Sequence, residues 1–170
     1  SYLAGSKALG ELALILAKTK ERRAQAGEIA LQGLKVAESV SSCSDDRCHA
    51  LEDIAEVLLT LGKAPEAHTA TRHVWALWKR EKEKIYTEPV VHLQAIATLF
   101  AKLGQNKEAQ EVAEMHLKLA KAAPHSGELP FAVETFAKIG RLEDARKIAE
   151  RIPDSWERQE ALKNITEFGG

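Results

Sequence analysis

Cysteine and histidine residues gather in one stretch of the chain, and they are the side chains best suited to bind a metal ion. Cys43 and Cys48 are five positions apart, His49 follows directly, and His68 and His73 stand further along. Histidines that share a metal ion on one helix are spaced by about four residues. His68 and His73 are five positions apart, so they would diverge by about 140° around a helix. The spacing therefore predicts no metal site, and the two cysteines are expected either to form a disulfide or to remain as thiols.

The same stretch places a cysteine beside a histidine, which is the pair that nucleophilic catalysis would need. A catalytic thiol must lie within hydrogen-bonding distance of its base, but neighbours such as Cys48 and His49 project in different directions from a helix. The sequence contains no G-x-S-x-G, H-E-x-x-H, C-x-x-C or glycine-rich phosphate-binding pattern. We therefore expect no enzyme activity and no cofactor.

Apolar residues at a fixed spacing indicate which elements carry these side chains. From Leu51, Leu93 and Leu129, apolar residues follow at offsets +3, +4, +7 and +10, which places them on one stripe of an α-helix. A weaker copy starts at Leu9. Glycine adopts at low cost the left-handed conformation that ends many helices. The residue at +11 is glycine in the three strong copies: Gly62, Gly104 and Gly140.

A second helix is predicted after each glycine, where an acidic residue precedes alanine at Glu66-Ala67, Glu108-Ala109 and Asp144-Ala145. The acid lies in the first turn, where the helix dipole stabilises negative charge. Asp154, with Glu157 three positions later, predicts the capped start of a ninth helix. The chain is therefore predicted to be all-α, with nine helices in antiparallel pairs, as one repeat domain over residues 1–170. The repeats span about 6–44, 45–87, 88–125 and 126–153, and a partial or capping helix spans 154–170.

The connection Gly-x-x-x-[Asp/Glu]-Ala, preceded by Leu-x-x-[Ile/Ala]-[Ala/Val]-x-x-[Leu/Phe], resembles the tetratricopeptide repeat (TPR). It occurs at 51–67, 93–109 and 129–145, and the resemblance covers about residues 9–168. The repeats that start at Leu9 and Leu51 are longer than is usual in that family. The resemblance implies a right-handed α-solenoid of antiparallel helix hairpins, a TPR-like superhelix whose concave groove is lined by the first helices.

The resemblance also implies which residues face the groove and contact a partner. TPR domains that bind chaperones hold a C-terminal carboxylate with basic residues and asparagine, whereas three glutamates stand at these positions here. A chaperone clamp is therefore not expected, and the partner is predicted to be a peptide or helix of another protein. Glu134 and Lys138 also stand in the i,i+4 order that stabilises a helix without any ligand. The groove positions are His49, Glu52, Glu56, Gln94, Thr98, Lys102, Glu134 and Lys138.

The tryptophans leave two interpretations open. Trp75 and Trp78 share a helical stripe with Val74, so they either pack between second helices or form an exposed outer ridge for a partner. Trp156, at the start of the last helix, is expected to staple the helix cap.

Single-stranded RNA is an alternative ligand, because residues 136–147 also resemble a pentatricopeptide repeat. Such arrays carry Asn, Ser or Thr at a base-reading position where this chain has Glu52, Gln94 and Pro130. The groove also holds as much acid as base, which does not favour phosphate. Nucleic acid is therefore not the expected ligand, and a structural spacer within a larger protein is the third alternative.

Composition and charge indicate which partners and which cellular location to expect. The chain has 24 Lys+Arg and 25 Asp+Glu, with a formal net charge of −1, so it has no general attraction to nucleic acid or anionic membranes. Its longest apolar run, residues 12–17, is too short to span a membrane. Two cysteines and no visible signal peptide predict a cytoplasmic location. The abrupt end near Phe168 predicts self-association through open solenoid ends, or a continuation of the chain.

Overall fold

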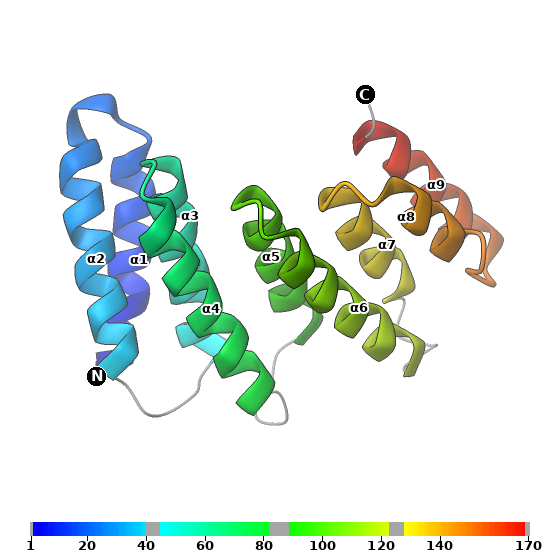
Figure 1. Cartoon of the computed structure of the whole chain (residues 1–170), viewed down its shortest axis with the longest axis horizontal. Coiled ribbons are helices and arrows are strands. Elements are labelled where there is room, and N and C mark those ends of the chain that lie inside the picture. Colours follow the sequence, from blue (N-terminus) through cyan, green and yellow to red (C-terminus); the bar gives the residue numbers. More distant parts are fainter. Residues whose placement is uncertain (1, 40–44, 82–88, 123–127, 169–170) are drawn as a thin grey trace. The chain divides into compact units, whose positions relative to one another are not determined.

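All regular structure in the described part of the chain is helical. The computed structural model describes residues 2–39, 45–81, 89–122 and 128–168 (Figure 1). No strand occurs in these ranges, which confirms the predicted all-α class, and no helix there is long and apolar enough to cross a bilayer. The elements are α1 (Tyr2–Ala17), the short 3-10 helix η1 (Lys20–Arg22), α2 (Arg23–Ser39), α3 (Asp45–Thr60), α4 (Ala64–Glu81), α5 (Pro89–Lys102), α6 (Asn106–Ala122), α7 (Leu129–Lys138), α8 (Leu142–Ala149) and α9 (Ser155–Phe168).

The chain divides into two compact units, Ser1–His92 and Leu93–Gly170, with the boundary inside α5. In the first unit α1 packs against α2 and α3, α2 packs against α3, and α3 packs against α4. In the second unit α7 packs against α6, α8 and α9, and α8 packs against α9. Each unit therefore contains a hairpin with the following helix packed on both of its members: α1–α2–α3 and α7–α8–α9 (Figure 1).

The turns after α3, α5 and α7 share one geometry. The predicted glycines, Gly62, Gly104 and Gly140, have φ angles of 74°, 73° and 79°. In each turn the glycine amide donates to the carbonyl three residues earlier, and the next amide donates to the carbonyl five residues earlier, at 2.8 to 3.0 Å. These bonds satisfy carbonyls that the end of the helix would otherwise leave without a donor. The predicted helix ends are therefore confirmed, and they rest on the low cost of positive φ for glycine.

The apolar stripes of the three strong copies supply core residues, whereas Leu12, on the stripe predicted for the weaker copy, is 44% exposed. Leu51, Ile54 and Leu58 of α3 are buried, as are Val133 and Phe136 of α7. The alanines predicted at the start of the second helices are also buried, which lets the two members of a hairpin approach closely. These alanines are Ala67, Ala109 and Ala145.

Trp75 and Trp78 of α4 lie in the core. Their exposed fractions are 5% and 0%, and their rings are stacked with centroids 5.5 Å apart. The ammonium group of Lys79 lies 4.7 Å from the centroid of the Trp75 ring, where the π-electrons attract a cation. The packing interpretation therefore holds, and neither tryptophan forms an exposed outer ridge.

The start of α9 has the predicted cap but not the predicted staple. The carboxylate of Asp154 accepts hydrogen bonds from the backbone amides of Trp156 and Glu157, both at 2.8 Å. The Trp156 side chain is 71% exposed, so the expectation that it staples the cap is wrong. Asp154 holds the helix start through backbone bonds, which need no apolar contact from the tryptophan.

Candidate functional site

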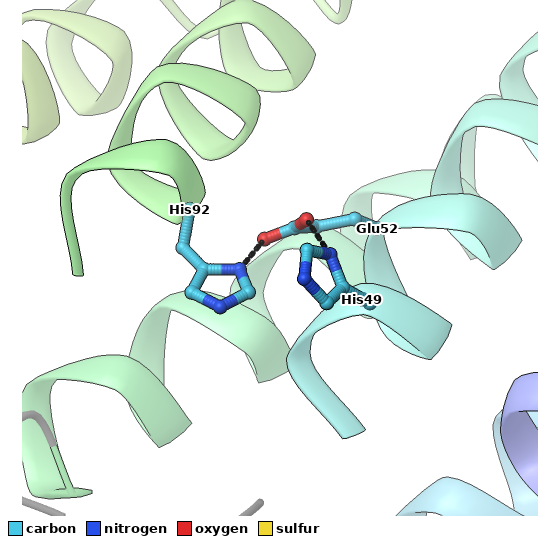
Figure 2. Close-up of side chains that lie close together, drawn as sticks. All are labelled: His49, Glu52 and His92. Atoms are coloured by element: carbon cyan, nitrogen blue, oxygen red, sulfur yellow. Dashed lines mark hydrogen bonds and ion pairs between the residues drawn. The ribbon is translucent and has the colours of Figure 1, made fainter. Parts of the chain in front are cut away.

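Two histidines and a glutamate meet beside α3 in the first unit, and we call them the His–Glu–His cluster (Figure 2). His49 and Glu52 are three positions apart on α3, so they share one face of that helix. His92 reaches them from the first turn of α5. Nδ1 of His92 lies 2.7 Å from Oε1 of Glu52, and Nδ1 of His49 lies 3.5 Å from Oε2. Since a carboxylate accepts hydrogen bonds, Nδ1–H of His92 is the donor to Glu52.

The three side chains differ in their access to solvent. The His92 side chain is 1% exposed, that of Glu52 is 10% exposed, and that of His49 is 43% exposed. The two imidazole rings lie 4.5 Å apart between centroids and are tilted by 52°. A buried carboxylate is costly unless hydrogen bonds or positive charge compensate it. Both histidines supply such contacts, and His49 is the member of the cluster through which solvent reaches it.

Asp53 adds a second acidic group next to the cluster. Burial raises the pKa of the Asp53 carboxyl above its usual range, and the nearby Glu52 and Glu11 raise it further. His49 and Lys7 lower that pKa, but they do not outweigh the burial. The acidic groups Asp53, Glu52 and Glu11 therefore repel one another.

The donor atoms of the cluster are close enough to share one ion. One donor atom from each of the three residues lies within 4.8 Å of the other two. Among the residues that the sequence first brought to attention, His49 belongs to this group, whereas Cys48 is buried one position before it in α3 and Nδ1 of His73 lies 3.2 Å from a carboxylate oxygen of Glu38. Cys43 lies outside the described residues, so its predicted alternatives stay predictions.

His92 was not found from the sequence, because it is 40 positions away from Glu52. The available signal was its place in the predicted repeat. His92 directly precedes the leading Leu93, as Ala50 precedes Leu51 in the repeat that carries His49. Aligning the two repeats and comparing their first turns would have placed the two histidines near one another.

The remaining groove positions lie in rows along their own helices. On α5, Gln94 and Thr98 are partly exposed and Lys102 is exposed, and the Thr98 hydroxyl donates to the Gln94 carbonyl at 2.8 Å. On α7, Glu134 and Lys138 form the predicted i,i+4 ion pair at 2.8 Å.

On α3 the groove prediction separates into two cases. Glu56 is partly exposed one turn after Glu52, in keeping with a position that a partner could reach. Glu52 itself is buried, and both its carboxylate oxygens face histidines. The expectation that Glu52 faces a partner therefore does not hold, because the side chain turns inward to the cluster.

A cleft of about 280 Å³ lies between α6 and α8 in the second unit. Arg141 is held at its edge by an ion pair with Asp144 and a hydrogen bond to Gln110. Its lining includes four basic and two acidic side chains, so the cleft carries an excess of positive charge. The sequence did not predict this cleft, which is lined by Gln110, Glu114, Leu117, Lys121, Phe136, Arg141, Asp144, Lys147, Ile148 and Arg151.

A second buried histidine, His116 of α6, has a neutral partner. Its Nδ1 lies 2.8 Å from the hydroxyl oxygen of Thr135, whose own proton is donated to the Phe131 carbonyl at 2.9 Å. The hydroxyl therefore accepts from Nδ1–H, and Nε2 of His116 has no hydrogen-bond partner among the described residues. Burial lowers the pKa of His116 to about 4, although Glu134 acts to raise it. The imidazole is thus a neutral core group near pH 7.

Comparison with known proteins gave no match: no family model fits the chain, and neither a curated protein nor a solved structure is similar to it.

Proposed function

We propose that this chain is a protein–protein interaction module that binds a peptide or helix of a partner protein without catalysing a reaction. The proposal includes a TPR-like fold, in which the hairpins stack as a right-handed α-solenoid and the first helices line a concave groove. The observation that supports it best is the repeated turn at Gly62, Gly104 and Gly140, with the same two hydrogen bonds in each copy. Repeated hairpins present equivalent faces at regular intervals, which suits recognition of an extended partner.

The polar rows on the first helices are the proposed contact surface. Each of three first helices has a partly exposed polar residue: Glu56 on α3, Thr98 on α5 and Glu134 on α7. The apolar stripes of the same helices are buried in the core. A partner with basic residues would complement the two glutamates. Glu52 is left out of this surface because it is buried.

A capture experiment with charge-reversal variants tests this surface. The full chain is used to capture partners from a lysate of the source cells, alongside Glu56→Lys/Glu134→Lys. The matched control is Glu28→Lys/Glu150→Lys, which makes the same charge change at exposed positions, one in each unit. We expect a partner that both parent and control retain and that the first variant loses.

Other outcomes would contradict the proposed surface in distinct ways. If Lys147→Glu/Arg151→Glu lost the partner and Glu56→Lys/Glu134→Lys retained it, the partner would contact the α6/α8 cleft instead. Salt-dependent binding of single-stranded RNA would support the pentatricopeptide-like alternative. Capture of no protein by the parent chain would support a structural spacer.

A further inference from the structure

We propose that the His–Glu–His cluster of His49, Glu52 and His92 binds one divalent transition-metal ion of the Zn²⁺ class. Two imidazole nitrogens and one carboxylate oxygen form a donor set that zinc uses in proteins, with a fourth position left for water or another ligand. Calcium and magnesium prefer sites built from oxygen donors alone. The two histidines therefore select for zinc and its neighbours in the transition series.

The spacing of the donor atoms allows an ion to enter with small side-chain movements. Zinc–nitrogen and zinc–oxygen bonds are about 2.0 to 2.2 Å long, so donor atoms around a tetrahedral ion lie about 3.3 Å apart. Here the three donor atoms lie within 4.8 Å of one another, and the His92–Glu52 contact measures 2.7 Å. Insertion of the ion would widen that contact by a fraction of an ångström and draw His49 inward.

The protein holds two of the donors in place before an ion arrives. His92 and Glu52 are buried and bonded to each other, so little rotamer freedom remains to be lost on binding. His49 is half exposed and sits one helical turn from Glu52, so it can rotate to admit the ion and then close on it. A buried pair with one mobile, solvent-facing donor provides both rigidity and an entry path.

Charge also favours a cation at this position. A carboxylate in a region of low dielectric is stabilised by a nearby positive charge far more than it would be in water. The imidazoles supply hydrogen bonds to Glu52, whereas a divalent ion would supply two positive charges. To bind the ion through Nδ1, His92 would release the proton that it donates to Glu52 or move it to Nε2. The ion would also join α3 to a residue 40 positions further along the first unit, so we expect binding to stabilise that unit.

Calorimetric titration of the full chain with Zn²⁺, after removal of bound metal with a chelator, tests the proposal. We expect one equivalent of Zn²⁺ to bind. His49→Gln should lower the affinity for Zn²⁺ by more than about tenfold, because substitution of residues that only support a metal ligand already lowers metal affinity tenfold or more. His49 is half exposed, so this variant should keep its helical circular dichroism. His73→Gln is the matched control, since His73 also faces a carboxylate, that of Glu38, and it should bind like the parent.

Substitution of Co²⁺ for Zn²⁺ gives a second measurement, because its visible absorption reports the donor atoms directly. We expect a spectrum of nitrogen and oxygen donors that His49→Gln and Glu52→Gln both abolish. A thiolate band would identify Cys48 as a ligand and overturn the proposed donor set. Absence of stoichiometric Zn²⁺ binding, or equal loss in His49→Gln and His73→Gln, would show that the cluster is a hydrogen-bonded group without an ion. His49 is half exposed, so the comparison of His49→Gln with the parent remains valid even if Glu52→Gln fails to fold.

Discussion

The two units of the chain each bury a histidine, and the two histidines differ in the charge of the group that they contact. In the first unit Nδ1 of His92 meets the carboxylate of Glu52 at 2.7 Å, with a second histidine on the other carboxylate oxygen. In the second unit Nδ1 of His116 meets the hydroxyl of Thr135 at 2.8 Å. The distances are almost equal, but one partner is an anion and the other is a neutral group.

This difference separates a group built for charge from a group built for packing. A hydroxyl completes one hydrogen bond and offers no net charge, so burial dominates and lowers the pKa of His116 to about 4. A carboxylate stabilises a positive charge beside it, such as a metal ion, because the electrostatic attraction between opposite charges is strong where water is excluded. Burial of a histidine alone therefore does not distinguish the two cases, whereas the charge of the residue that the imidazole contacts does.

The largest effect is expected from removing His92. His92→Leu, measured in the presence of a chelator, should lower the free energy of unfolding of the first unit by about 3 to 5 kcal/mol, because it removes the closest partner of a buried carboxylate. Urea unfolding followed by tryptophan fluorescence reports this unit, since Trp75 and Trp78 are buried there and Trp156 is exposed.

A double variant makes the comparison sharper. His92→Leu/Glu52→Leu should regain a large part of the lost stability, because it removes the stranded carboxylate as well. Equal losses in the single and double variants would mean that packing, and not the charge of Glu52, sets the cost.

The second effect is a pH dependence in the second unit. In the unfolded chain His116 takes up a proton near pH 6.5, whereas in the folded chain its pKa is about 4. Between these values the unfolded state binds more protons, so the free energy of unfolding falls as the pH falls, by about 3 kcal/mol in total. Above pH 6.5 this loss is absent. Urea unfolding followed by circular dichroism at several pH values should show the decline.

A variant assigns the decline to His116. The side-chain amide of His116→Asn can still donate to Thr135 but does not titrate in this range. We expect its stability to change less between pH 6.5 and 4 than that of the parent. An unchanged slope would place the titrating group elsewhere.

The smallest of the three effects on the free energy of unfolding is expected from replacing Thr135, the neutral partner of His116. Thr135→Val keeps the shape of a buried side chain but leaves Nδ1–H of His116 without its acceptor, which should cost about 1 to 3 kcal/mol. Thr166→Val in the same unit is the matched control, because its hydroxyl bonds a backbone carbonyl at an exposed position. If both variants lost the same stability, the His116–Thr135 bond would contribute nothing specific.

Local patterns were sufficient to predict where several helices begin and end. Leu51 and its followers predicted the buried face of α3, and Gly62 predicted the residue at which the following turn reverses. Asp154 predicted the start of α9 through bonds to backbone amides two and three residues later. Each of these features depends on residues within about one or two helical turns, so spacing alone carries the information.

The sequence was less informative where the outcome depended on a neighbouring element. The groove assignment placed Glu52 toward a partner, but in the structure His92 lies against it and the side chain is buried. Trp156 follows a capping residue, yet its side chain is exposed. In both cases the helix was predicted correctly, but what covers each side chain was decided by elements that the local pattern does not describe.

The sequence by itself determined that this protein is helical, where α3, α5 and α7 end and which of their faces is buried, because these properties follow from periodicity and from the backbone preferences of single residues. The tertiary structure decided which polar groups meet. His92 and Glu52 are 40 positions apart, and His116 and Thr135 are 19 apart. Long-range pairs of this kind depend on how helices cross and on the register between them, and that register is set by the packing of many side chains at once.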